Sequence, residues 1–124
     1  MIRVRDWMSS PVLTIRPNAS ILDAAKIMDK HNIGALIVQG TSKVHGIITE
    51  RDIMRKIVAK KKAPARMKVK DAMTEELHTV NINAKLIDIT KIMDRHNIRR
   101  IAVLDKGKLV GILTSRDLIG LVSV

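Results

Sequence analysis

The sequence contains no cysteine, tyrosine or phenylalanine, and Trp7 is its only large aromatic residue. The lack of cysteine excludes disulfides, thiolate nucleophiles and the common zinc sites that are built on cysteine. No two of the 4 histidines have the spacing of metal ligands on a helix, so we expect no metal site. With so few aromatics, Ile, Leu, Val and Met must form the core, and platforms on which single-stranded bases could stack are nearly absent.

Long apolar runs are also missing, since none approaches the roughly 20 residues that a membrane span needs. Residues 1–10 lack the apolar stretch of a signal peptide, so we expect a cytoplasmic protein without a membrane span. The sequence has no Gly-x-x-x-x-Gly-Lys loop, no Gly-x-Gly-x-x-Gly and no Gly-x-Ser-x-Gly, which predicts that the protein is not an enzyme. Its 124 residues, 46% hydrophobic and 28% charged, suit one small folded module.

Positive charge is in excess and is concentrated in one stretch. The 23 Lys and Arg residues outnumber 12 Asp and Glu residues, for a net charge of +11. Residues 51–70 hold nine basic residues against the single acid Asp52. The basic residues are Arg51, Arg55, Lys56, Lys60, Lys61, Lys62, Arg66, Lys68 and Lys70. Such a stretch attracts polyanions, so binding of DNA or RNA through its residues from Arg55 onward is one hypothesis and a solvated charged linker is the other.

The chain contains an internal repeat with an offset of 65 residues and no gap. Four segments recur in register, namely 4–6 as 69–71, 26–29 as 91–94, 31–33 as 96–98, and Gly46-Ile47-x-Thr49-x-Arg51-Asp52 as Gly111-Ile112-x-Thr114-x-Arg116-Asp117. Each copy is too small to bury an apolar face alone, so we expect the two to pack about a pseudo-twofold axis. We assign residues 1–59 to repeat 1, residues 60–68 to a basic linker and residues 69–124 to repeat 2.

The hydrophobic pattern predicts a β-α-β-β-α unit in each repeat, and therefore an α/β (α+β) fold. In the first copy, residues 12–15 favour a strand, and Ser20-x-x-Asp23 caps a helix that ends near residue 31. Residues 36–39 and 44–48 favour two further strands, and a helix begins at Thr49. The second copy repeats this order, with a hairpin turn at 105–107 and a helix from Thr114.

This doubled pattern, which ends in Gly-h-h-Thr-x-Arg-Asp (h apolar) at the start of a helix, resembles the CBS domain, the cystathionine-β-synthase-type repeat. The resemblance covers nearly the whole chain. It implies that two repeats form a disc-shaped Bateman module with two clefts for adenosine ligands such as AMP, ADP, ATP or S-adenosylmethionine. It also implies a regulatory energy or metabolite sensor without an obligatory cofactor.

The resemblance assigns the ribose hydroxyls to Asp52 and Asp117, which stand at helix starts, and a carboxylate can accept two hydrogen bonds from a diol. The remaining ligand-binding positions that it implies are Thr49, Thr114, Arg51, Ser115 and Arg116 at the same helix starts, and Thr14 and Thr79 in the first strands near adenine. Helix starts favour anions, so a phosphate group fits there. Thr-x-x-Asp is also a capping box, in which the two residues only satisfy free N–H groups. Both interpretations stay open.

The repeats differ after the shared His-Asn-Ile, where the first continues Gly34-Ala35 and the second Arg99-Arg100. In the family, basic residues here reach the phosphate of the ligand whose ribose the other repeat holds. We therefore expect Arg99 and Arg100 to serve the Asp52 ligand and favour phosphorylated molecules, and we expect the Asp117 cleft to be empty or to hold an uncharged adenosine end. Neighbouring strand side chains point to opposite faces, which leaves open that one of the two arginines faces solvent instead.

Two helices offer apolar faces to a twofold partner, one over residues 53–58 and one with Leu118, Ile119, Leu121 and Val122. We expect a homodimer or larger assembly. Three functions remain open: a sensor whose association depends on an adenosine ligand, a DNA- or RNA-binding protein, and a module that docks on an unidentified protein partner.

Overall fold

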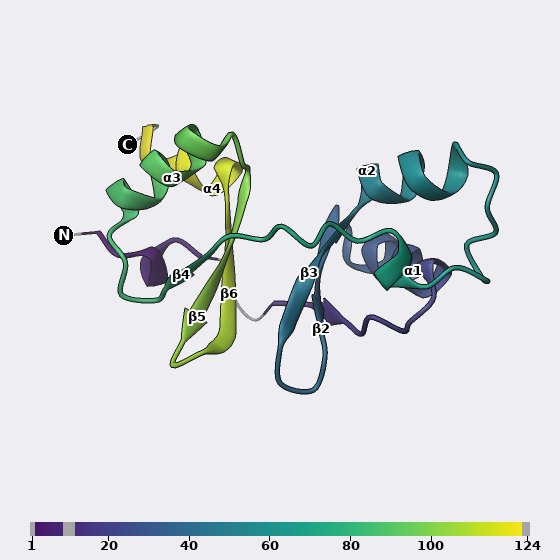
Figure 1. Ribbon diagram of the computed structural model, residues 1–124. Helices are drawn as coiled ribbons and strands as arrows, with labels where there is room; N and C mark the ends of the chain where they lie inside the picture. The colour runs from purple at the N-terminus through teal and green to yellow at the C-terminus, as the bar shows by residue number, and fades with distance from the viewer. Residues whose placement is uncertain (1, 9–11, 123–124) are drawn as a thin grey trace. The chain divides into compact units, whose positions relative to one another are not determined.

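A computed structural model describes residues 2–8 and 12–122 of the chain, with the side chains of residues 119–122 outside the description (Figure 1). The chain divides into two compact units. The central unit is Leu13–Glu76, and the terminal unit combines Met1–Val12 with Leu77–Val124. Over the described residues, no helix combines the length and the apolar character that crossing a bilayer requires.

Each unit contains one three-stranded sheet and its helices. The central unit has β1 (Thr14–Ile15), α1 (Ile21–His31), β2 (Ala35–Gln39), β3 (Val44–Thr49) and α2 (Glu50–Ile53), which continues as a π-helical segment (Met54–Val58), and then a 3-10 turn (Val69–Asp71). The terminal unit has a 3-10 turn (Val4–Asp6), β4 (Thr79–Asn81), α3 (Leu86–His96), β5 (Arg100–Asp105), β6 (Lys108–Thr114) and α4 (Ser115–Val122). The predicted α+β fold is confirmed.

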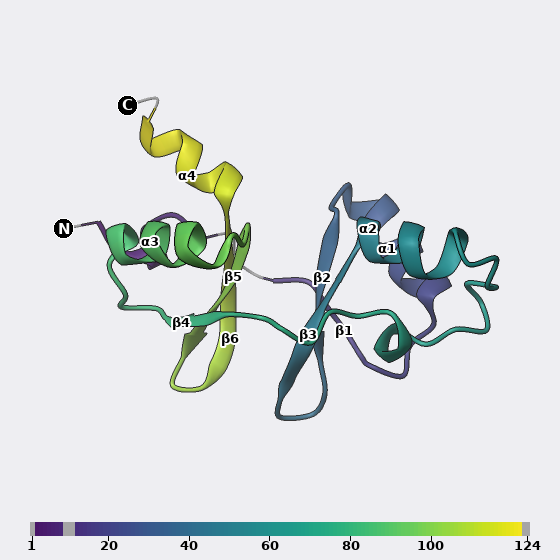
Figure 2. The same ribbon diagram turned by 45° about the horizontal axis from the view of Figure 1, so that its top comes forward.

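The two sheets have the same topology, with strand orders β1-β2-β3 and β4-β5-β6. In each, the first strand is parallel to the second, and the second and third form an antiparallel hairpin (Figure 2). Both hairpins shift register once, between Val38 and Gln39 and between Val103 and Leu104. The sequence repeat therefore corresponds to a repeat of structure.

The long helices begin and end as their sequences require. The side chain of Ser20 accepts a hydrogen bond from the Asp23 N–H at 3.0 Å, which confirms the predicted cap of α1. At the other end, Asn32 adopts a left-handed conformation with φ of 53°. Its repeat counterpart Asn97 ends α3 with φ of 51°. Asparagine tolerates this conformation better than most residues, so the repeated His-Asn pair is a helix stop signal.

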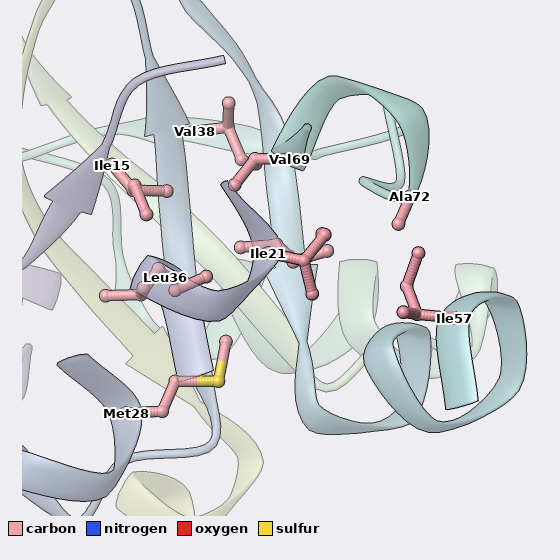
Figure 3. Packing of buried hydrophobic residues seen from close by; sticks show 10 residues of the cluster. Ile15, Ile21, Met28, Leu36, Val38, Ile57, Val69 and Ala72 are labelled. Atoms are coloured by element: carbon pink, nitrogen blue, oxygen red, sulfur yellow. The ribbon is translucent and has the colours of Figure 1, made fainter. Parts of the chain in front are cut away.

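Each core lies between a helix and one face of a sheet. In the central unit, α1 contributes Ile21, Ala24 and Met28, which share one helical face and pack against Leu36 and Val38 of β2 (Figure 3). The terminal unit uses the repeat counterparts of most of these positions, with Leu86, Ile89 and Met93 on α3 packed against Ile101 and Val103 of β5. The helical spacing of apolar residues thus determines which face each helix buries.

The first residues of each repeat complete the core of the other repeat. Val4 belongs to the core of the terminal unit and Val69 to that of the central unit. The backbone N–H of Val4 donates to the Ala84 carbonyl at 3.1 Å, and that of Val69 donates to the Ala19 carbonyl at 2.8 Å. The compact units therefore have different boundaries from the sequence repeats, and residues 60–68 lie within the central unit.

Candidate functional site

Both predicted ligand-binding helix starts form capping boxes. In the central unit, the Thr49 N–H donates to Asp52 Oδ2 at 3.1 Å, and the Asp52 N–H donates to Thr49 Oγ1 at 3.1 Å. In the terminal unit, the Thr114 N–H donates to Asp117 Oδ2 at 2.8 Å, and the Asp117 N–H donates to Thr114 Oγ1 at 3.4 Å. The capping role is therefore present at both sites. It uses one carboxylate oxygen of each aspartate and leaves the other for further contacts.

The second oxygen of Asp52 is already engaged within the central unit. Lys56 Nζ forms an ion pair with Asp52 Oδ1 at 3.1 Å, and the Thr74 hydroxyl donates to the same oxygen at 3.2 Å. The lysine also donates to the Ala72 carbonyl at 2.9 Å. Asp52 is only 8% exposed. Since a carboxylate has about four acceptor positions, a diol that binds both of its oxygens must displace Lys56 or Thr74.

Asp117 differs because its second oxygen is open within the described residues. There Oδ2 accepts hydrogen bonds from the N–H and the hydroxyl of Thr114, and the Asp117 N–H donates to Thr114 Oγ1. The repeat counterpart of Lys56 is Leu121, which cannot form an ion pair. Asp117 is half-buried. Its free oxygen can accept a hydrogen bond from a ligand without displacing a cation.

Strand register places the predicted threonines on the sheet face that does not pack against α1 or α3. Thr14 pairs with Ile37 and Thr49 with Ala35, whereas the core-forming Leu36 and Val38 alternate with these residues along β2. Paired residues point to the same face of a sheet. In the terminal unit, Thr79 pairs with Ala102 and Thr114 with Arg100. First-strand threonine and helix-start threonine therefore share one face in each unit.

The register also separates the two predicted arginines. Arg100 lies in β5 opposite Thr114, so its half-buried side chain shares the face of the Asp117 helix start. Arg99 is exposed and precedes the strand, and its carbonyl accepts a hydrogen bond from the Ser115 N–H at 2.8 Å. Asp52 belongs to the other unit. The assignment of these arginines to the Asp52 ligand stays a prediction.

The central unit has glycine and glutamate, Gly34 and Glu50, where the terminal unit has Arg99 and Ser115. The Gly34 carbonyl accepts a hydrogen bond from the Glu50 N–H at 2.9 Å, as Arg99 does from Ser115. The Glu50 side chain covers Gly34 closely, because a Cβ on this glycine would lie 2.7 Å from Glu50 Oε1. An acid next to glycine thus replaces the serine next to arginine. Sequence reasoning missed Glu50 and the pairing of Lys56 with Asp52, although the counterparts Ser115 and Leu121 differ in charge from Glu50 and Lys56.

The other predicted ligand-binding side chains are accessible. Arg51, Ser115 and Arg116 are exposed at the helix starts, and Thr14 and Thr79 are exposed on the first strands. Thr14 also lines an open hollow of about 640 Å³ together with Arg16 and Lys26. In the described part of the chain, no group of three or more His, Cys, Asp or Glu side chains is placed to hold a metal ion.

On the helix over residues 53–58, which was predicted to face a partner, Met54 and Val58 are exposed, whereas Ile57 is buried in the core of its own unit. A groove of about 380 Å³ lies between α1 and the helix that starts at Glu50, and its apolar lining is Ala25, Met28, Ile33, Ile53, Met54 and Val58. Val58 is 61% exposed. On the terminal helix, Leu118 packs against the core of its own unit. The side chains of Ile119, Leu121 and Val122, which were predicted to face a partner, lie outside the described residues.

Comparison with known proteins identifies the family. The CBS domain model matches residues 4–59 and 69–124, so the chain belongs to the CBS-domain family and carries two such domains in tandem, as the sequence predicted. CBS domain-containing protein YhcV of Bacillus subtilis is 36% identical over 118 residues, which are 95% of this chain and 84% of that protein.

Two solved structures are close in fold. The CBS domain pair of protein MJ0100, crystallised in complex with 5'-methylthioadenosine and S-adenosyl-L-methionine, is 33% identical with a TM-score of 0.86, over 99% of this chain and 97% of that chain. The hexameric CBS-CP12 protein from bloom-forming cyanobacteria is 29% identical with a TM-score of 0.85, over 95% of this chain and 66% of that chain.

Proposed function

We propose that this CBS pair is a regulatory module, and not an enzyme, that senses an adenosine ligand such as AMP, ADP, ATP or S-adenosylmethionine. The observation that carries the proposal is the half-buried Asp117 with one carboxylate oxygen open among the described residues. The binding of two adenosine ligands by the related MJ0100 pair supports it. The cytoplasmic location stays a prediction from the sequence.

In this proposal, Asp117 accepts the ribose hydroxyls and Thr79 lies near the adenine. The positive end of the α4 dipole favours a phosphate at this helix start. Arg100 adds positive charge on the same sheet face, and Arg99, Ser115 and Arg116 are exposed close to it in the chain. Phosphate binding at this helix start does not exclude the predicted role of the arginines toward the Asp52 ligand.

A ligand at the Asp52 site binds less favourably, because Lys56 and Thr74 occupy the carboxylate oxygen that a ribose needs. We propose that a ligand at Asp52, with Thr14, Thr49 and Arg51 around it, releases Lys56. The released ammonium can then bind a phosphate group, which favours phosphorylated ligands at this site. The two sites would accordingly differ in affinity, with the Asp117 site the tighter.

Asparagine at the two aspartate positions tests this assignment. Asp117→Asn removes the charged acceptor but keeps an oxygen for the cap, and hydrogen bonds to a charged group contribute about 1.5–3 kcal/mol. We expect its affinity for AMP, ATP or S-adenosylmethionine at the tighter site to fall about 10- to 100-fold by isothermal titration calorimetry, with a smaller loss for Asp52→Asn. A wild-type chain that binds none of the three at millimolar concentration would refute the proposal.

Two further variants separate the sites in the same assay. Lys56→Met removes the cation from Asp52 Oδ1 and leaves only Thr74 to be displaced there, so S-adenosylmethionine should bind the second site more tightly while ATP loses a cation. Arg99→Gln with Arg100→Gln should weaken ATP and leave S-adenosylmethionine nearly unchanged. Combining the arginine change with Asp52→Asn or with Asp117→Asn then shows which ribose site these arginines serve, since residues on one ligand give non-additive effects.

We also propose that two or more copies associate through the groove beside Val58 and that the ligand shifts this equilibrium, which a partner protein then reads. A ligand shifts association only if it binds one assembly state more tightly. Val58→Glu places a charge on the groove and should lower the sedimentation coefficient to that of a monomer at micromolar concentration. Ile87→Glu is a matched control, because Ile87 is 59% exposed on α3. Equal behaviour of the two variants would refute the role of this groove.

A further inference from the structure

The segment after the π-helical turn is an ordered basic loop. Residues 59–68 carry Lys60, Lys61, Lys62, Arg66 and Lys68, all exposed, and Arg55 is exposed just before them. The only ion pair among the described residues joins Lys56 to Asp52, which is the one acid of residues 51–70. Residues 59–68 are called the basic loop. Its five cationic side chains and Arg55 beside it therefore present positive charge that no described carboxylate neutralises within 4.0 Å.

Backbone hydrogen bonds hold the loop in place at both ends. At its start, Lys61 adopts φ of 59°, and the N–H groups of Lys61 and Lys62 donate to the Val58 and Ile57 carbonyls, each at 3.0 Å. This pattern is a Schellman motif, which ends the helix sharply. The loop then returns to the start of α1 (Figure 2). Its positive charges are thus attached to a fixed backbone.

The far part of the loop caps α1. The Leu22 N–H donates to the Pro64 carbonyl at 3.1 Å, and the Ile21 N–H donates to the Met67 carbonyl at 2.9 Å. With the Ser20 side chain on the Asp23 N–H, the first three helical N–H groups all have acceptors. Helix starts leave these donors unsatisfied unless another group supplies oxygens. The loop is therefore part of the folded unit, and little backbone entropy is lost when it binds a partner.

We infer that the basic loop is a docking surface for the phosphate backbone of double-stranded nucleic acid. A duplex carries one negative charge per about 1.7 Å of axis, which a loop with closely spaced cations can match, and each contact releases a counterion. Stacking on single-stranded bases requires aromatic side chains, and residues 51–70 contain none. Binding should consequently be independent of base sequence.

The composition of the loop argues against a membrane as its partner. Anchoring in a bilayer surface combines cations with inserted apolar or aromatic side chains. The nonpolar residues of the loop are three alanines, Pro64 and Met67. Met67 packs against the core of the central unit. An anionic bilayer would therefore receive only the electrostatic part of the attraction, which a duplex of higher charge density supplies more strongly.

Salt-dependent binding to a duplex tests the inference. We expect a fluorescein-labelled 24-bp DNA duplex of arbitrary sequence to bind the full chain, with fluorescence anisotropy giving a slope of log affinity against log salt of about −5 for six phosphate contacts. Changing Lys60, Lys61 and Lys62 to glutamine together should reduce the magnitude of the slope by about 2.7, because each phosphate that a lysine neutralises adds about 0.9 to it. A single strand of equal length should bind more weakly.

The matched control changes Lys43, Lys106 and Lys108 to glutamine. These three lysines are exposed on the two hairpins, and Lys106 has φ of 51°, close to that of Lys61. The control removes the same net charge outside the basic loop and should leave the slope nearly unchanged. Equal losses in the two triple variants, or no binding to the duplex at about 50 mM salt, where polyanion contacts are strong, would overturn the inference. So would binding to vesicles with anionic lipid but not to the duplex. No free mononucleotide or S-adenosylmethionine is added, so the result is separate from that of the proposed adenosine site.

Discussion

Replacing Val4 with aspartate is expected to unfold the terminal unit while the central unit keeps its structure. Val4 is 0% exposed and packs in the same core as Ile89, Ile101 and Leu113. An uncompensated charge at such a position costs about 3–5 kcal/mol, in addition to the lost burial of the valine. A unit of this size is stable by only about 0.05–0.15 kcal/mol per residue, so the change removes most or all of its stability.

Hydrogen exchange measured by mass spectrometry locates the effect. Peptides from β5, β6 and α3 should lose protection in Val4→Asp, whereas peptides from α1 and β2 should keep theirs. Ile2→Asp is the matched control, because Ile2 is 48% exposed only two residues away, and it should resemble the wild type. Unchanged protection of β5 in Val4→Asp would contradict the packing described for this segment.

Replacing Gly46 with alanine is expected to lower the free energy of unfolding of the central unit by about 2–3 kcal/mol. A Cβ on Gly46 would overlap the Thr74 carbonyl oxygen and lie 3.1 Å from the Glu75 Cα. These atoms are backbone, so no side-chain rotation relieves the overlap. The same Thr74 exchanges two hydrogen bonds with Ile47, at 2.8 and 2.9 Å, and donates to Asp52. The substitution therefore displaces a segment that also orients a site residue.

Urea denaturation followed by circular dichroism measures this loss as a lower transition midpoint. Gly107→Asn is the control, because Gly107 has φ of 80° and nothing within 4 Å of a Cβ, and asparagine tolerates that conformation. We expect its midpoint to stay close to that of the wild type. Similar losses in both variants would mean that the close approach at Gly46 does not constrain the unit.

The features that the sequence predicted are those encoded within a few residues. The order of strands and helices follows from the hydrophobic pattern, and the helix ends at Asn32 and Asn97 follow from a short motif, so both were predicted correctly. The pairing of Lys56 with Asp52 was also accessible, since i,i+4 neighbours on a helix meet. It was missed because the aspartate was assigned to a ligand first.

Other contacts carry no local signal. Thr74 donates to Asp52 from 22 positions away, and neither residue type nor spacing indicates that contact. The shared core of Val4 and Leu113 also has no local signal. The sequence around a valine in a short 3-10 turn is the same whichever core the valine enters. Contacts between distant segments depend on how the chain is connected in space, which periodicity does not describe.

The placement of Val4 also sets the order in which the chain acquires its structure during translation. The central unit is a continuous stretch, Leu13–Glu76, so all of its residues are synthesised before β5 and β6 of the terminal unit. Val4 is synthesised before the central unit, yet Leu113 of its core follows roughly a hundred residues later, a delay of about 5–20 s at 5–20 residues per second. During that interval the Val4 segment has no native core to enter, so a segment that is synthesised before the central unit can pack only after that unit has been made.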